Sequence, residues 1–379
     1  MKHSTPQSLV LAAWVSCLVL VTGCGSGSPK PVAPPIGEVK AIQPIKPLWT
    51  LKLSAPSQLT QSLQVVNQKV ALAGSAGQVT LVDLSQAKTL WQIDLGKPLQ
   101  TGAGFDGESV AVVNVANELS VLQDGKQLWQ KRLPAQSFTN PVVAGERVFV
   151  LLADRSVMAF DLTNGKRLWT QQRPGEPLVL KQNGVLMPFQ NSLLASLGGR
   201  FVALNPDNGQ VLWDVAIANP RGLNDLERLV DLVGTASRFN NTVCVRAFQS
   251  QLGCVNAVRG SLVWNRASVG NKGISGDEAS LVGAESNGVV RAWNRANGER
   301  LWDTDRLKYR DLSQPLWTAK GVVITDEGGW LYVLSGKDGS LLNRLQSPAP
   351  GFASAPTALD DGSFVVLARN GLLLAYQLP

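Results

Sequence analysis

The amino-acid sequence predicts an all-β protein, an eight-bladed β-propeller with four antiparallel strands in each blade. First, a tryptophan recurs about every 40 residues along the 379-residue chain, and a period of that length indicates a repeat fold. Second, all of these tryptophans but the first follow alternating apolar residues, a turn of the Asp/Asn-Gly type and Leu or Val. The recurring residues are Trp49, Trp91, Trp129, Trp169, Trp213, Trp264 and Trp302.

One repeat shows how the blade is predicted. Residues 155–169 read RSVMAFDLTNGKRLW, in which apolar residues alternate with the period of a β-strand. The Asn-Gly turn and the short stretch ending in tryptophan are typical of a β-hairpin. Two further short strands are expected upstream, at 141–143 and 147–152. Four strands in about 40 residues make one propeller blade.

The repeat count predicts how the ring closes. Seven units run from Trp49 to Asn343, which stands where a further tryptophan is expected. An eighth unit covers 354–366 and 371–378, and then the chain stops before its fourth strand. The segment 48–53 has no blade of its own, so we expect it to supply that strand. Closure would remove the exposed sheet edges that invite aggregation.

The repeated side chains have expected structural roles. Each tryptophan should pack between adjacent blades, bury about 150–250 Å² and donate its indole N–H to a backbone carbonyl. The alternative is a stripe of aromatic rings that stack on a ligand. Asn343 should mark the weakest contact between blades. Ala159, Ala203 and Ala292 share one repeat position, where small residues would suit strands crowded near the axis.

The amino end predicts export and lipidation. Residues 1–23 combine Lys2 with an apolar stretch that is short for a membrane span, which is typical of a signal peptide. Residues 20–24, LVTGC, resemble the lipobox of bacterial lipoproteins, in which the cysteine, here Cys24, carries lipid. The alternative is an ordinary signal peptide. Gly25 follows where inner-membrane lipoproteins have Asp, so the resemblance implies the outer membrane. Residues 24–47 are rich in proline and glycine and are expected to form a tether before a propeller at 48–379.

Residue composition argues against several functions. His3 is the only histidine and lies in the signal peptide, so the usual general base and metal ligand would be missing from the mature protein. We expect no catalytic residue, metal or cofactor. The formal net charge is +7 with mixed signs, and no nucleic-acid partner is expected. Cys244 and Cys254 flank a predicted hairpin turn, where either a cross-strand disulfide or two buried thiols would fit.

The repeats resemble the tryptophan-docking repeats of pyrroloquinoline-quinone (PQQ) enzymes. Together with the lipobox, the tether and eight degenerate blades, the chain resembles the BamB family, lipoprotein subunits of the outer-membrane β-barrel assembly machine. This resemblance implies a non-enzymatic protein on the periplasmic face of the outer membrane, held there by its lipid anchor. In that family two loops bind a POTRA domain of the barrel protein BamA. Other subunits would be contacted indirectly, and unfolded outer-membrane proteins are a further candidate partner.

Two segments carry the resemblance to those loops. Residues 176–181, EPLVLK, match a Leu-x-Leu-Arg loop at Leu178 and Leu180, with Lys181 in place of arginine. Residues 225–231, DLERLVD, resemble the family's acidic, arginine-containing loop. The matching residues are Glu227, Arg228 and Asp231. Val233 stands where the family commonly has a second aspartate.

The spacing of the repeats points to the second loop independently. The interval from Trp213 to Trp264 is the longest, which places an insertion near 216–238, and loops on rigid scaffolds commonly carry function. Its leucines recur every third residue, as in a short helical turn with one apolar side, or they pack on their own blade. These are Leu223, Leu226, Leu229 and Leu232.

Three functions fit the fold. The first is a scaffold that docks on BamA and aids assembly of outer-membrane proteins. The second is a PQQ-dependent dehydrogenase, which would need a calcium site and often has adjacent cysteines; the sequence has no adjacent pair. The third is a generic interaction propeller. Fold alone does not separate them.

Overall fold

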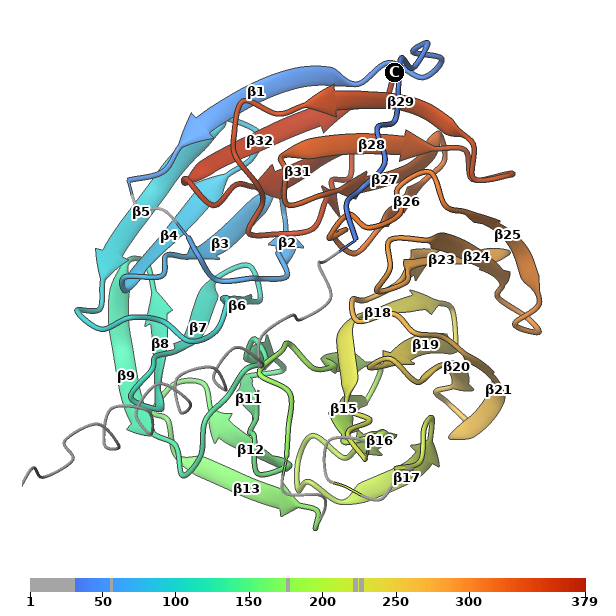
Figure 1. The fold of residues 1–379 in the computed structure, drawn as a ribbon. Coiled ribbons are helices and arrows are strands. Elements are labelled where there is room, and N and C mark those ends of the chain that lie inside the picture. Colours follow the sequence, from blue (N-terminus) through green and yellow to red (C-terminus); the bar gives the residue numbers. More distant parts are fainter. Residues whose placement is uncertain (1–30, 55–56, 175–177, 221–223, 225–227) are drawn as a thin grey trace, which may run out of the picture. The chain divides into compact units, whose positions relative to one another are not determined.

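The computed structural model describes residues 31–54, 57–174, 178–220, 224 and 228–379. These residues contain no α-helix; their strands form eight antiparallel sheets of four strands each. In Figure 1 the sheets stand side by side around a ring, as blades of a propeller. The predicted fold class is therefore confirmed. In the described part of the chain, no helix is long and apolar enough to cross a membrane.

The first four blades follow one another along the chain. Blade 1 contains β2 (Val65–Val66), β3 (Lys69–Ala73), β4 (Gln78–Asp83) and β5 (Lys88–Asp94). Blade 2 contains β6 (Gly104–Phe105), β7 (Ser109–Val113), β8 (Glu118–Gln123) and β9 (Lys126–Arg132). Blade 3 contains β10 (Val142–Ala144), β11 (Arg147–Leu151), β12 (Ser156–Asp161) and β13 (Arg167–Gln172). Blade 4 contains β14 (Leu186–Phe189), β15 (Ser192–Leu197), β16 (Arg200–Leu204) and β17 (Val211–Ala216).

The remaining blades include the one that closes the ring. Blade 5 contains β18 (Leu232–Phe239), β19 (Thr242–Ala247), β20 (Gln251–Asn256) and β21 (Ser261–Ala267). Blade 6 contains β22 (Ser275–Gly276), β23 (Ser280–Ala284), β24 (Val290–Asn294) and β25 (Arg300–Thr304). Blade 7 contains β26 (Leu316–Thr318), β27 (Gly321–Thr325), β28 (Trp330–Leu334) and β29 (Leu341–Gln346). Blade 8 contains β30 (Thr357–Ala358), β31 (Ser363–Leu367), β32 (Leu372–Gln377) and β1 (Lys46–Lys52).

The fourth, outermost strand of a blade docks its tryptophan on the next blade. The indole N–H of Trp264 donates to the carbonyl of Arg295 at 2.7 Å, in the turn between the third and fourth strands of blade 6. Four other tryptophans donate to the equivalent turn of the following blade at 2.7–2.9 Å: Trp129, Trp169, Trp213 and Trp302. Trp49 and Trp91 are half-buried on β1 and β5.

A glycine in each of these five turns makes room for the indole ring. A Cβ on Gly298 would lie 2.5 Å from Trp264, and this residue has φ +72°, a conformation that glycine adopts without a steric penalty. Gly165, Gly209, Gly260 and Gly339 stand in the same relation to the preceding tryptophan. The turn glycine and the tryptophan of adjacent repeats are thus two halves of one contact.

Gly298→Ala should therefore destabilise the protein more than Gly96→Ala does. Both glycines have φ near +70°, but a Cβ at Gly96 would meet nothing within 4 Å. We expect the left-handed backbone to cost about 1 kcal/mol at either site. The overlap with Trp264 should add about 1–3 kcal/mol at Gly298. Urea unfolding of both variants measures the difference, and equal losses would contradict this docking contact.

The alanines occupy a different place from the one expected. Ala159, Ala203 and Ala292 lie on the third strand of their blades, β12, β16 and β24, and each pairs across the sheet with a tryptophan of the fourth strand. The register of that pairing shifts just beyond each alanine. The expectation that they lie on strands crowded near the axis is wrong, because the third strand is next to the outermost strand of the blade.

The amino-terminal segment closes the ring as predicted. Strand β1 pairs antiparallel with β32, from Lys46 opposite Gln377 to Lys52 opposite Leu372. The segment before it, residues 34–45, also belongs to the compact unit, which spans Pro34–Pro379. Ile36 and Ile45 are buried in apolar clusters of blades 6–8, and the segment runs over blade 7 (Figure 1). We call residues 34–45 the arm. The tether expected to end at residue 47 thus packs on the propeller from Pro34 onward.

The arm also reaches the position that lacks a tryptophan. The Asn343 side-chain amide donates to the Gln43 carbonyl at 2.8 Å, and the Ile42 N–H donates to the Leu342 carbonyl at 2.9 Å. Gln43 Nε2 donates to the carbonyl of Pro379 at 2.9 Å. At this contact between blades, the Asn343 amide therefore takes the place of the tryptophan indole. The arm takes the place of the turn that accepts the indole N–H at the other contacts.

Cys244 and Cys254 are directly opposite each other on β19 and β20. Their sulfur atoms are bonded at 1.99 Å, and both residues are fully buried beside Trp264 and Trp293. The crosslink lies inside blade 5, the blade that follows the insertion.

Candidate functional site

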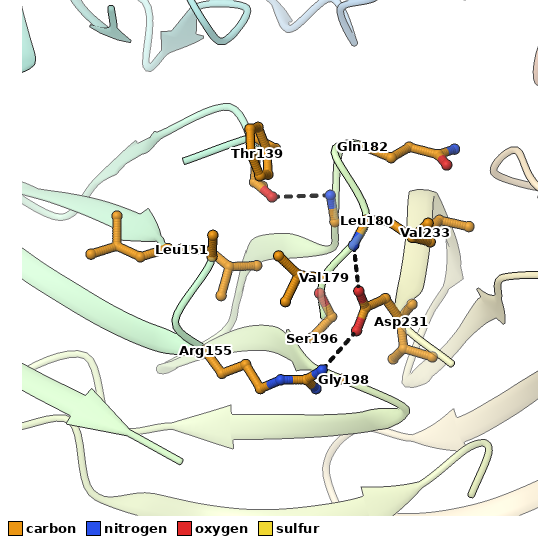
Figure 2. Close-up of a pocket in the computed structure, with 15 residues that line it drawn as sticks. Thr139, Leu151, Arg155, Val179, Leu180, Gln182, Ser196, Gly198, Asp231 and Val233 are labelled. Carbon is orange, nitrogen blue, oxygen red and sulfur yellow. Dashed lines mark hydrogen bonds and ion pairs between the residues drawn. The ribbon is translucent and has the colours of Figure 1, made fainter. Parts of the chain in front are cut away.

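The two loops identified in the sequence meet on one face of the propeller. They are the connections from β13 to β14 and from β17 to β18, each leading from an outermost strand to the first strand of the next blade. Turns between second and third strands lie on the same face, because strand direction alternates within a blade. The turns at 152–155 and 198–199 complete the site (Figure 2).

Asp231 joins the loops to each other. Its Oδ2 accepts the backbone N–H of Leu180 at 2.9 Å, and its Oδ1 lies 3.5 Å from Nη2 of Arg155. Arg155 Nη2 also donates to the Leu178 carbonyl at 3.1 Å. Figure 2 shows the carboxylate between the arginine and the Leu180 loop. The carboxylate expected to contact a partner therefore serves first to hold the two loops together.

Arg155 is the residue that the sequence did not single out. It sits in the turn between β11 and β12 with φ +63°, and its side chain is only 12% exposed. A Cβ on Gly198 would lie 2.0 Å from its Nη1, so only glycine leaves space for this guanidinium. Its Nε has no hydrogen-bond partner among the described residues. The guanidinium is therefore held by the Asp231 carboxylate and the Leu178 carbonyl, and a buried arginine depends on such partners.

Further contacts fix both ends of the 173–185 loop. At its start, Arg173 pairs with Asp214 on β17, which also accepts Nε of Arg200 at 2.6 Å. At its end, the Gly184 N–H donates to Thr139 Oγ1 at 3.0 Å. These contacts hold both ends of the loop against neighbouring parts of the propeller.

The predicted partner-binding residues differ in exposure. Leu178 is 44% exposed, and Lys181 and Arg228 are exposed as well, whereas Leu180 and Asp231 are half-buried. The backbone N–H of Arg228 donates to the Asn224 carbonyl at 3.2 Å. Val233 is buried at the start of β18. Glu227 and Cys24 lie outside the described residues. The exposed set is thus one apolar side chain and two cations.

The insertion predicted at 216–238 is only partly a loop. Leu232 is buried and begins β18, so 232–238 belongs to the first strand of blade 5. This strand extends to Phe239, and its pairing with β19 shifts between Val233 and Ser237. Leu232 and Val233 are both buried at the start of this strand, so this leucine packs in the core rather than on the surface.

Two cavities open near the site. One of about 50 Å³ lies under the loops and is lined by Leu151, Val179, Leu180 and Asp231 among others. The second, of about 610 Å³, is lined by residues from seven of the blades, including Lys181 and Gln314. Phe138 and Gln182 line both cavities, so they adjoin.

Side chains at the larger cavity are engaged with each other. Asn183 Nδ2 donates to Ser62 Oγ at 3.1 Å, and the Thr235 N–H donates to Gln314 Oε1 at 3.2 Å, which links blades across the ring. Ion pairs join Lys272 to Asp311 and Arg369 to Glu327 at 3.8 and 3.5 Å. Among the described residues, no group of three or more His, Cys, Asp or Glu side chains could hold a metal ion.

Comparison with known proteins identifies the family. The family model described as outer membrane protein assembly factor BamB matches residues 75–304. The outer membrane protein assembly factor BamB of Burkholderia pseudomallei is 31% identical over 97% of this chain and 98% of its own length. The chain belongs to the BamB family.

Solved structures agree with the fold of the BamB family. The crystal structure of BamB from Moraxella catarrhalis superposes with a TM-score of 0.80 at 18% identity, covering 88% of this chain and 99% of that one. Quinohemoprotein alcohol dehydrogenase from Comamonas testosteroni gives a TM-score of 0.68 at 12% identity, over 89% of this chain and 77% of the dehydrogenase. Both likenesses show the propeller fold; membership of the BamB family rests on the sequence comparisons.

In this member of the BamB family, the loop junction carries a perturbed carboxylate. Burial raises the pKa of Asp231 above its usual value, although the Leu180 N–H and the Arg155 guanidinium both favour the ionised form. A raised pKa in the folded state means that the protonated form stabilises folding. This contribution is complete below the pKa of the unfolded chain and is lost as pH rises through the folded value.

Asp231→Asn should therefore change how stability depends on pH. Asparagine keeps an oxygen for the Leu180 N–H and does not ionise. We expect the melting temperature of the wild type, relative to that of the variant, to fall as the pH rises above the usual aspartate pKa of about 4. Thermal unfolding of both proteins at increasing pH measures the difference. A constant difference would contradict a raised pKa at this site.

Proposed function

We propose that this protein is a non-enzymatic scaffold of the outer-membrane β-barrel assembly machine that docks on a POTRA domain of BamA. Its relatives are named outer membrane protein assembly factors, which supports the general role. The docking contact is our proposal, as are lipidation at Cys24 and a position on the periplasmic face of the outer membrane.

One observation carries the docking proposal: Asp231 holds two loops, distant in sequence, in one fixed arrangement. A fixed loop loses less conformational entropy when it binds, because its ordering has already taken place on folding. The junction leaves Leu178 exposed beside Lys181, an apolar anchor next to a charge. Such an anchor within a polar rim is the usual composition of an interface hot spot.

Leu178→Ala should weaken binding of a purified BamA POTRA fragment by about tenfold or more, because it removes the central apolar contact. Leu301→Ala is the matched control, since Leu301 is 48% exposed on β25 of blade 6. Isothermal titration of both variants, with their melting temperatures recorded, tests the proposal. It fails if Leu178→Ala binds like the wild type, or if the wild-type protein does not bind the fragment.

A further inference from the structure

One position on the outer strands separates the blades into two groups. It lies two residues before the tryptophan, or before Asn343, and pairs with the third strand just beyond the shift in register. In four blades it holds a polar or charged residue: Thr89, Gln127, Arg167 and Arg300. In three blades it is aliphatic, and together with the residue after it, which is aliphatic in all seven of these blades, it forms an aliphatic pair. These pairs are Val211–Leu212, Leu262–Val263 and Leu341–Leu342.

The pair on blade 7 is covered by the chain itself. Leu341 packs against the same cluster as Ile36 and Val39 of the arm. Leu342 packs against the cluster that contains Ile45, and its carbonyl accepts the Ile42 N–H at 2.9 Å. A segment without regular secondary structure thus covers an outer strand by one backbone hydrogen bond and aliphatic side chains. Both leucines are half-buried as a result.

The pairs on blades 4 and 5 are exposed. Val211 and Leu212 are 39% and 51% exposed, and Leu262 and Val263 are 42% and 45% exposed. Strands β17 and β21 contact each other, so the two pairs belong to neighbouring blades. Each strand is also the outer edge of its sheet, and no described strand pairs with its far side. We call these four residues, with the edges that carry them, the rim patch.

We propose that the rim patch binds an extended, aliphatic segment of an unfolded outer-membrane protein, as the arm binds blade 7. The chemistry of the occupant follows from the arm: side chains such as isoleucine and valine, and a backbone N–H that reaches an edge carbonyl. Free strand edges accept such segments through main-chain hydrogen bonds, while alternate side chains fill the apolar sites.

The strands of outer-membrane barrels have this pattern. They alternate apolar and polar residues over about ten positions, so an unfolded chain offers many such segments. The identity of this partner rests on the proposed function, whereas the covered pair on blade 7 supports the mode of binding independently. The patch lies on the outer rim, away from the loops joined by Asp231, so BamA and a client would use different surfaces.

The test uses substitutions that the repeat already tolerates. Val211→Arg with Leu262→Arg gives blades 4 and 5 the residue that blades 3 and 6 carry at this position. Thr89→Arg with Gln127→Arg adds the same charges to blades 1 and 2 as the control. The probe is a fluorescent peptide of about ten residues in which valine alternates with threonine. Fluorescence anisotropy measures its affinity for each protein, and titration with the POTRA fragment is repeated on both variants.

We expect Val211→Arg/Leu262→Arg to weaken peptide binding at least about tenfold and the control to match the wild type. A photoreactive residue at position 212 should crosslink to the peptide, whereas one at position 90 should not. Equal peptide affinities, or equal crosslinking at both positions, overturn the proposal. A wild-type dimer that disappears in the rim variant would also overturn it, because the occupant would be a second copy of the chain. If the wild-type protein did not bind the POTRA fragment, that result would instead count against the proposed function.

Discussion

A chain that begins at Leu53 is expected to lose cooperative folding, whereas a chain that begins at Pro34 should unfold like the full protein. The shorter chain lacks β1, so blade 8 would have three strands and β32 would present an open edge. It also lacks the arm, which buries Ile36 and Ile45 against blades 6–8. Each buried aliphatic side chain contributes about 1.5–3 kcal/mol, a large share of a typical net stability of about 5–15 kcal/mol.

Far-UV circular dichroism during heating measures the cooperativity of both chains. Addition of a synthetic peptide covering residues 34–54 to the shorter chain should restore a sharp transition, because the missing strand binds at the open edge. A cooperative transition in the shorter chain without peptide, at the temperature of the longer one, would show that closure is dispensable.

Asp231→Ala should have the second large effect. It leaves the Leu180 N–H and the Arg155 guanidinium without their acceptor in a place where both side chains of the pair are less than a fifth exposed. We expect a loss of about 2–3 kcal/mol in stability and a marked loss of POTRA binding, because the loops are no longer joined. Urea unfolding and titration with the POTRA fragment measure the two effects.

A double variant distinguishes the loss of one partner from the loss of both charged groups. Arg155→Met with Asp231→Leu removes both charged groups and fills their space with apolar atoms, so it should lose less stability than Asp231→Ala alone. POTRA binding should stay weak, since the bond to the Leu180 N–H is still missing. Additive losses in stability would show that the two residues do not act as a pair.

The blades could be predicted from sequence because each repeat has the same local sequence pattern. Alternating apolar residues, a tight turn and a tryptophan give strand, hairpin and docking contact in every unit, and the strand count then requires β1 in blade 8. The arm escaped prediction because Ile36 and Ile45 are isolated among prolines and polar residues. Their burial depends on clusters supplied by residues about 300 positions away, and such distant partners leave no local pattern.

The residues of the site were predictable only where the resemblance marked them, although the repeat spacing also indicated the second loop. Leu178, Leu180 and Asp231 stood in matching segments, and the structure brings them together. Arg155 had no such mark, since one arginine in a turn is usually solvated. Its importance follows from Gly198, in the turn between β15 and β16, and from the carboxylate of Asp231, just before β18. The charges of a site can be read from sequence, but the pairs they form are decided by tertiary packing.

The segment just before β1 and the carboxyl terminus meet at blade 8. Gln43 and Pro379 are hydrogen-bonded, so a short linker between them would produce a covalently continuous circle. Chains whose ends lie this close generally tolerate circular permutation. New ends opened at another exposed turn would let the chain begin at another blade while leaving every strand pair intact. The blade next to which the propeller begins can therefore be changed by design without changing the propeller.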